Sequence, residues 1–199
     1  MSLYNLLRRH ITDYSVIIRN FAHVLTYLSP LNYMIKVKIT VPPHIAEYIR
    51  GKFYDPDVCA VRFPSSLDLY VAIYDYAERR PVSCPVDTGN LEFCLPDRRE
   101  ANVAGGKNPE SYNYFSATSQ KKLGDKMRVM MLAELHDLMD ENKHLHGIQF
   151  KDTIYRFVRR YCIESITEDA LFKDYQRWRY KQHRRKQKRE YHSKKSQKN

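Results

Sequence analysis

The pattern of apolar and polar positions between residues 34 and 104 predicts a mixture of strands and helices. Residues 35–41 alternate one apolar with one polar side chain, a period of two that is typical of a half-buried strand. Short apolar runs over 58–63 and 91–95 predict two further strands. Helices are predicted over 44–51 and from Ser65 to about 79, since Ser65 stands three residues before Asp68 in the manner of a capping box.

The pattern becomes helical after residue 116. A long helix is predicted over about 119–143, and a second begins near Gln149. A break at 163–165 separates it from a third helix, for which Ser165 and Glu168 form a candidate capping box. We therefore predict an α+β fold: a small antiparallel sheet with helices in the N-terminal half, and a helical C-terminal half that ends in a basic helix.

Turn-forming residues and changes of pattern divide the chain into five segments. Residues 1–33 are predicted to be a helical leader or a non-native extension, because the strand-like run at Met34 is a natural start. The other four are a small α/β domain over 34–104, a linker loop over 105–118, a helix-turn-helix-like region over 119–189 and a disordered basic tail over 190–199.

The formal net charge of +11 lies almost entirely at one end of the 199-residue chain. Residues 177–199 contain eleven Lys or Arg and one acidic residue, Glu190, whereas the first 176 residues are nearly neutral. A concentrated positive charge favours a polyanionic partner, of which nucleic acid is the first candidate and an anionic membrane surface the second. A solubilising extension would have the same composition.

The helices after Gln149 resemble a helix-turn-helix in outline. Leu171, Tyr175 and Trp178 form an apolar stripe that would dock the last helix on its own domain. The turn has Cys162 and Ile163 where glycine is common, and two ordinary packed helices remain an alternative. The candidate nucleic-acid-binding residues are Lys173, Gln176, Arg177, Arg179, Lys181, Arg184, Arg185, Lys186, Lys188 and Arg189. Among them, Lys173, Gln176 and Arg177 are candidates for base contacts.

His136, Asp140 and His144 recur every four residues on the long helix. Imidazole and carboxylate groups at this spacing can bind a divalent metal. The order is not His-Glu-x-x-His and no second ligand set is evident, so a solvated helix face is the alternative and no metal is assigned. The four cysteines lack Cys-x-x-Cys spacing, which gives no support to a zinc ribbon. No cofactor is predicted.

Several stretches are similar to uncharacterised proteins of bacterial mobile elements, including transposable prophages. They are GNLEFCLPDRREANVAGGKNPESYNYFS, MLAELHDLMDENKHLHGIQFKDTIYRFVRRY and ALFKDYQRWR, within about 34–189. The resemblance brings no known activity or site residue. It implies a bacterial, cytoplasmic setting in which DNA binding is a plausible role.

The leading expectation is a non-enzymatic protein that binds nucleic acid, duplex DNA before RNA, through the basic C-terminal helix. One alternative is a metal-dependent nuclease that uses the His136, Asp140 and His144 face. The other is a protein-interaction module, in which residues 34–104 bind a partner and the basic end directs the chain to nucleic acid. No membrane span is predicted, and the pattern does not determine the oligomeric state.

Overall fold

The computed structural model describes residues 34–84, 87–96 and 107–196, and it describes side chains as far as Arg185. The predicted leader and the end of the basic tail lie outside these residues. Contacts divide the chain into Met1–Met34 and one compact unit from Ile35 onward. The elements of this unit are β1 (Lys36–Ile39), α2 (Pro43–Phe53), β2 (Tyr54–Asp55), β3 (Ala60–Val61), α3 (Asp68–Tyr76), β4 (Leu91–Cys94), α4 (Ala117–Leu145), α5 (Phe150–Arg160) and α6 (Glu168–Ser196).

The four strands form one sheet in the order β1-β4-β3-β2. β1 pairs with β4 antiparallel, from Lys36 opposite Cys94 to Ile39 opposite Leu91. β2 and β3 are also antiparallel, but β3 meets β4 in parallel at Val61 and Phe93. The α+β class is confirmed. The sheet is mixed rather than wholly antiparallel, because the connection from β3 to β4 contains α3 and so allows a parallel return.

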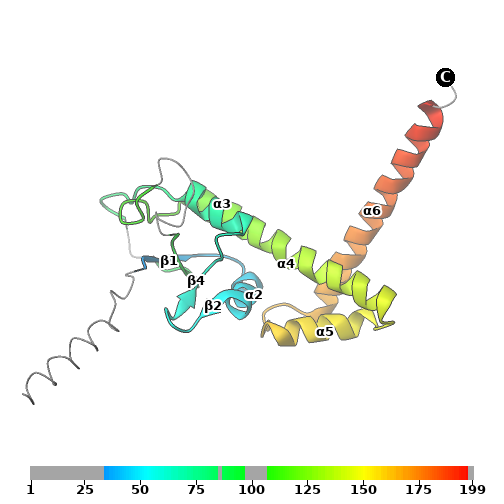
Figure 1. Cartoon of the computed structure of the whole chain (residues 1–199), viewed down its shortest axis with the longest axis horizontal. Coiled ribbons are helices and arrows are strands. Elements are labelled where there is room, and N and C mark those ends of the chain that lie inside the picture. The colour runs from blue at the N-terminus through cyan, green and yellow to red at the C-terminus, as the bar shows by residue number, and fades with distance from the viewer. Residues whose placement is uncertain (1–33, 85–86, 97–106, 197–199) are drawn as a thin grey trace, which may run out of the picture. The chain divides into compact units, whose positions relative to one another are not determined.

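Helix α4 joins the sheet half to the helical half. One stripe of α4 is fully buried and packs against α2 and α3; it consists of Leu123, Met127, Met131, Leu135 and Met139. The same core contains Phe93 of the sheet and Phe157 of α5. Figure 1 shows α4 running from α3 past α2 to the hairpin with α5.

Residues 107–116 lie within the predicted linker and pack closely against α3. Lys107 donates from Nζ to the carbonyls of Asp75 and Ala77, both at 2.7 Å. Tyr114 forms an isolated antiparallel bridge with Glu78. Phe115 is buried, and its ring contacts that of Phe93.

The helix ends differ in part from the predicted ones. α3 begins after Leu67 without a side-chain cap, so the predicted Ser65 capping box is wrong. α6 is capped by Thr167, whose Oγ1 accepts from the amide of Ala170 at 3.3 Å. Ser165, which was predicted to cap α6, donates to Glu47 instead. Within the described part of the chain, no helix is long and apolar enough to span a membrane.

The C-terminus of α5 is closed by a left-handed residue that is not glycine. Cys162 has φ of 51°. The amide of Ile163 donates to Val158 O at 2.9 Å and that of Cys162 to Arg159 O at 3.4 Å, which is the hydrogen-bond pattern of a Schellman motif. The sequence lacks glycine at this turn, and Cys162 occupies the position where glycine is common.

Replacing Cys162 by glycine should stabilise the protein. A left-handed backbone costs a residue with a Cβ roughly 1–2 kcal/mol, and part of this gain is offset by the greater freedom of glycine in the unfolded chain. The free energy of unfolding of the Cys162→Gly protein, measured by urea denaturation, should therefore be about 0.5–1 kcal/mol higher than that of the Cys162→Ala protein. Cys162→Ala is the matched control, because it removes the thiol and keeps the Cβ. Equal stabilities would contradict this account of the turn.

Candidate nucleic-acid interface

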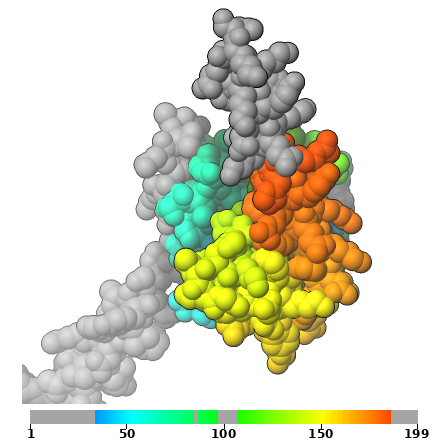
Figure 2. All heavy atoms as spheres, turned by 90° about the vertical axis from the view of Figure 1, so that its right-hand side faces the viewer, coloured from blue at the N-terminus to red at the C-terminus, as the bar shows by residue number. Residues whose placement is uncertain are grey.

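Helix α6 is held by an anchor formed by the stripe Leu171, Tyr175 and Trp178 against α4 and α5. Leu171 and Tyr175 are about 1% exposed, as the sequence pattern predicted for a docking stripe. The Tyr175 ring lies 5.1 Å from that of Phe150. Figure 2 shows the neighbouring surfaces of α5, in yellow, and the first half of α6, in orange. On the opposite side of the same turns, Lys173, Gln176 and Arg177 are exposed.

Polar contacts within the anchor use two of the metal-site candidates. The Tyr175 hydroxyl donates to Asp140. Burial and this hydrogen bond raise the pKa of Tyr175 to about 12, so the phenol stays protonated at neutral pH. The His136 ring packs against Trp178, with centroids 4.6 Å apart.

His136 is buried as a neutral imidazole. Its Nε2 lies 3.5 Å from Asp174 Oδ2 without hydrogen-bond geometry. Burial lowers the pKa of His136 and outweighs the opposing effect of the nearby carboxylates of Asp174, Asp140 and Asp137. His144 is exposed. The three candidates are therefore not gathered into a ligand set, and the described residues contain no group of three or more His, Cys, Asp or Glu side chains able to hold a metal.

The exposed side of α6 carries most of the predicted nucleic-acid-binding residues. Those that the structure places in solvent are Lys173, Gln176, Arg177, Lys181, Arg184 and Arg185. Arg179 is only partly exposed, and its guanidinium lies 5.8 Å from the centre of the Phe150 ring. It belongs to the edge of the anchor as much as to the exposed side. Lys186, Lys188 and Arg189 lie on the described helical backbone, but their side chains are outside the described set.

The charge of α6 changes sign along its length. Glu168 and Asp169 occupy the first turn, where a carboxylate interacts favourably with the positive end of the helix dipole. The basic residues follow from Lys173 onward. Any polyanion would therefore be repelled from the first turn and attracted to the later turns.

Two carboxylates fix the segment that connects α5 to α6. Glu47 Oε2, on α2, accepts from the amides of Glu164 and Ser165 at 2.9 and 3.1 Å, and from the Ser165 hydroxyl at 2.9 Å. Burial opposes ionisation of Glu47, but the hydrogen bonds from Ser165 and Glu164 outweigh it and lower the pKa. The α6 start is thereby tied to a helix more than a hundred residues earlier in the chain.

Glu134 of α4 is the second carboxylate. It accepts from the hydroxyls of Tyr48 and Tyr161 and pairs with Lys52. Burial favours the neutral acid, but the hydrogen bonds from Lys52 and the two tyrosines lower the pKa of Glu134. Gly51 permits the backbones to meet, because a Cβ at this position would lie only 2.6 Å from the carbonyl oxygen of Tyr161. The roles of Glu47 and Glu134 were not predictable from local sequence, since their hydrogen-bond partners are distant in the chain.

Removal of the Glu47 charge should destabilise the protein in a pH-dependent way. Hydrogen bonds to a partly exposed carboxylate contribute about 1–2 kcal/mol to stability. The Glu47→Gln protein should therefore have a free energy of unfolding lower by about that amount at neutral pH. Because its folded pKa is lowered, the contribution is complete above the pKa of an unfolded-state glutamate and is lost as pH falls through the folded pKa. Stability curves of the two proteins should converge in acid. The exposed Glu141→Gln is the control; a constant gap across pH would contradict the assignment.

Comparisons with known proteins add no template for this site. No protein-family model, curated protein or solved structure matches the chain. The similarity to mobile-element proteins stays a prediction.

Proposed function

We propose that the protein binds nucleic acid, duplex DNA in the first place, through the exposed basic side of α6 and without catalysing a reaction. The observation that carries this proposal is the combination of an anchored helix with an exposed row of cations. The anchor supplies rigidity, and the row supplies charge. Both are needed for a helix that binds a phosphate backbone at a fixed orientation.

Four of the six basic residues of α6 whose side chains are described form a row; Arg179 and Arg185 lie outside it. Lys173, Arg177, Lys181 and Arg184 follow one another at intervals of four, four and three residues. At 3.6 residues per turn these four positions fall within an arc of about 80° on the helix surface. The row faces away from the buried stripe of Leu171 and Tyr175. A helix of this kind fits the major groove, which is about 12 Å wide and admits one α-helix.

The residues have two roles within this proposal. Phosphate contacts would come from Arg177, Arg179, Lys181, Arg184, Arg185, Lys186, Lys188 and Arg189. Base contacts would come from Lys173, Gln176 and Arg177, because amide and guanidinium groups can pair with base edges in the groove. Arg177 can take either role. The acidic first turn keeps the start of the helix away from the phosphates, so the later turns make the contacts.

The helix gains from such a partner. Arg177 and Lys181, and likewise Lys181 and Arg185, are like-charged neighbours four residues apart, an arrangement that weakens an isolated helix by a few tenths of a kcal/mol per pair. Phosphates between these side chains would relieve the repulsion. Duplex binding would therefore stabilise the part of α6 beyond Trp178.

The setting proposed for this activity is that of a regulator or accessory factor of a bacterial mobile element, in the cytoplasm and near the nucleoid. The nuclease alternative has no ligand cluster among the described residues. The alternative in which residues 34–104 bind a protein stays a prediction. No specific contact favours either over nucleic-acid binding.

Neutralising two residues of the row should weaken duplex binding in a salt-dependent way. Each phosphate contact contributes about 0.9 to the slope of log affinity against log salt on duplex DNA. Lys181→Gln with Arg184→Gln should therefore reduce the slope by about 1.8, as measured by fluorescence anisotropy on a labelled duplex. The loss should be similar for unrelated sequences, since phosphates carry no sequence information.

The matched control removes the same charge from another exposed helix surface. Lys121 and Lys126 are exposed near the start of α4, on either side of Asp125. Lys121→Gln with Lys126→Gln should leave the slope unchanged. If both double variants reduce the slope equally, net charge alone drives binding; if neither does, α6 is not the interface. Circular dichroism on all the proteins checks that the fold is kept.

A further inference from the structure

A second basic surface lies on α5, and the proposed function does not use it. Its exposed basic and aromatic residues are Lys151, Tyr155, Arg156, Arg159 and Arg160; Asp152, the one acidic residue of α5, is exposed beside them. We call these five residues the α5 surface. Its charge is not needed for packing, because the other side of α5 contributes Ile154 and Phe157 to the core.

The α5 surface combines cations with an exposed aromatic ring. Tyr155 is 50% exposed, so one face of its ring is accessible to a ligand. The guanidinium of Arg159 lies 5.6 Å from the centre of that ring. The two planar groups form a small platform near Lys151, Arg156 and Arg160, whose charges outnumber that of the neighbouring Asp152.

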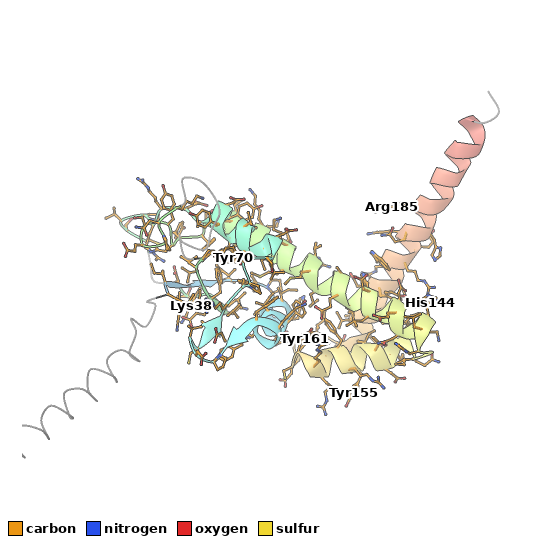
Figure 3. All side chains as sticks on the ribbon, viewed as in Figure 1. Lys38, Tyr70, His144, Tyr155, Tyr161 and Arg185 are labelled. Carbon is orange, nitrogen blue, oxygen red and sulfur yellow. The ribbon has the colours of Figure 1, made fainter. Side chains whose placement is uncertain are left out.

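The α5 surface is separate from the row on α6. In Figure 3, Tyr155 lies on the side of α5 turned away from α4, whereas Arg185 lies on the part of α6 that extends beyond α4. A short straight duplex that runs along the later turns of α6 would not cover Tyr155. The two surfaces therefore suit two different segments of nucleic acid.

We propose that the α5 surface is a second nucleic-acid site, which binds a single strand by stacking an unpaired base on Tyr155 and Arg159. Flat aromatic and guanidinium groups stack on bases only when the bases are not enclosed in a duplex. Lys151, Arg156 and Arg160 would contact the phosphates on either side. This inference extends the proposed function, since it gives the protein a preference for nucleic acid that has both paired and unpaired parts.

The charge of the α5 surface can be tested with a labelled oligothymidylate, which does not form a duplex with itself. Each phosphate contact contributes about 0.7 to the salt slope on a single strand. Lys151→Gln with Arg156→Gln should reduce the slope on oligothymidylate by about 1.4 and leave the slope on duplex DNA unchanged. The pair Lys121→Gln with Lys126→Gln is again the control of equal charge. A slope equal to that of the control pair would overturn the proposal, and an equal reduction on duplex DNA would overturn the preference for a single strand.

The stacking step has its own pair of variants. Tyr155→Ala should weaken oligothymidylate binding at least about fivefold, the lower end of the effect of removing one base stack. Tyr155→Phe keeps the ring and should bind within about twofold of the wild type on the same scale. Loss in both variants would assign Tyr155 a role through its hydroxyl, and loss in neither would remove it from the site; either result overturns stacking.

The two proposals fail separately. In the Lys181→Gln and Arg184→Gln protein, oligothymidylate binding should persist and duplex binding should weaken. If duplex binding is unchanged there while Tyr155→Ala loses the single strand, the function proposed for α6 is wrong and the α5 surface stands. If the Lys181→Gln and Arg184→Gln protein loses duplex binding while Tyr155→Ala keeps single-strand binding, α6 is the interface and the α5 surface is not a site.

Discussion

The position of α6 depends on hydrogen bonds that two partly buried carboxylates, Glu47 and Glu134, accept from distant parts of the chain. Glu47 accepts hydrogen bonds from the amides of Glu164 and Ser165 in the α5–α6 connection. Glu134 accepts hydrogen bonds from the hydroxyls of Tyr48 and Tyr161, where α2 meets the end of α5. A carboxylate that accepts several such bonds is stabilised in its charged form, so breaking one bond leaves a partly buried charge unsatisfied. The sheet half therefore orients the helical half through charged groups as well as through the apolar core.

Acidic and basic side chains have different roles along the molecule. Three acidic residues of α2 and α4 accept internal hydrogen bonds: Glu47, Glu134 and Asp140. The basic residues of α5 and α6 are mostly left in solvent. A nearly neutral first part of the chain is thus compatible with exposed surfaces of positive charge, because these acidic residues are paired internally while α5 and the described part of α6 present several exposed cations. This distribution favours a polyanionic ligand over a neutral one.

Local pattern was sufficient for the helices and for the three predicted strand runs, which contain β1, β3 and β4; β2 was not predicted. The stripe of Leu171, Tyr175 and Trp178 was predicted from spacing alone, because a helix repeats its faces every 3.6 residues whatever it packs against. The Thr167 cap was missed because Ser165 has the same local chemistry, and only the position of Glu47 decides between them.

The roles of His136 and Asp140 could not be predicted for a related reason. Their spacing is equally suitable for a metal and for contact with another helix, and the outcome depends on α6 lying across them. The parallel pairing of β3 with β4 likewise depends on the path of the chain through α3. The basic residues of α5 were visible in the sequence, but their common exposure became evident only once the buried side of α5 was known.

Beyond Trp178, α6 continues for eighteen residues, a length of about 27 Å. Mechanically this part is a lever arm whose pivot is the anchor. A tilt of about 10° at the pivot would displace the far end by about 5 Å, close to one turn of helix. Because a short duplex is nearly as stiff as a rod, such a displacement would change which phosphates the far turns can reach. The tightness of the packing around His136 and Trp178 therefore determines how precisely the far turns of α6 are oriented.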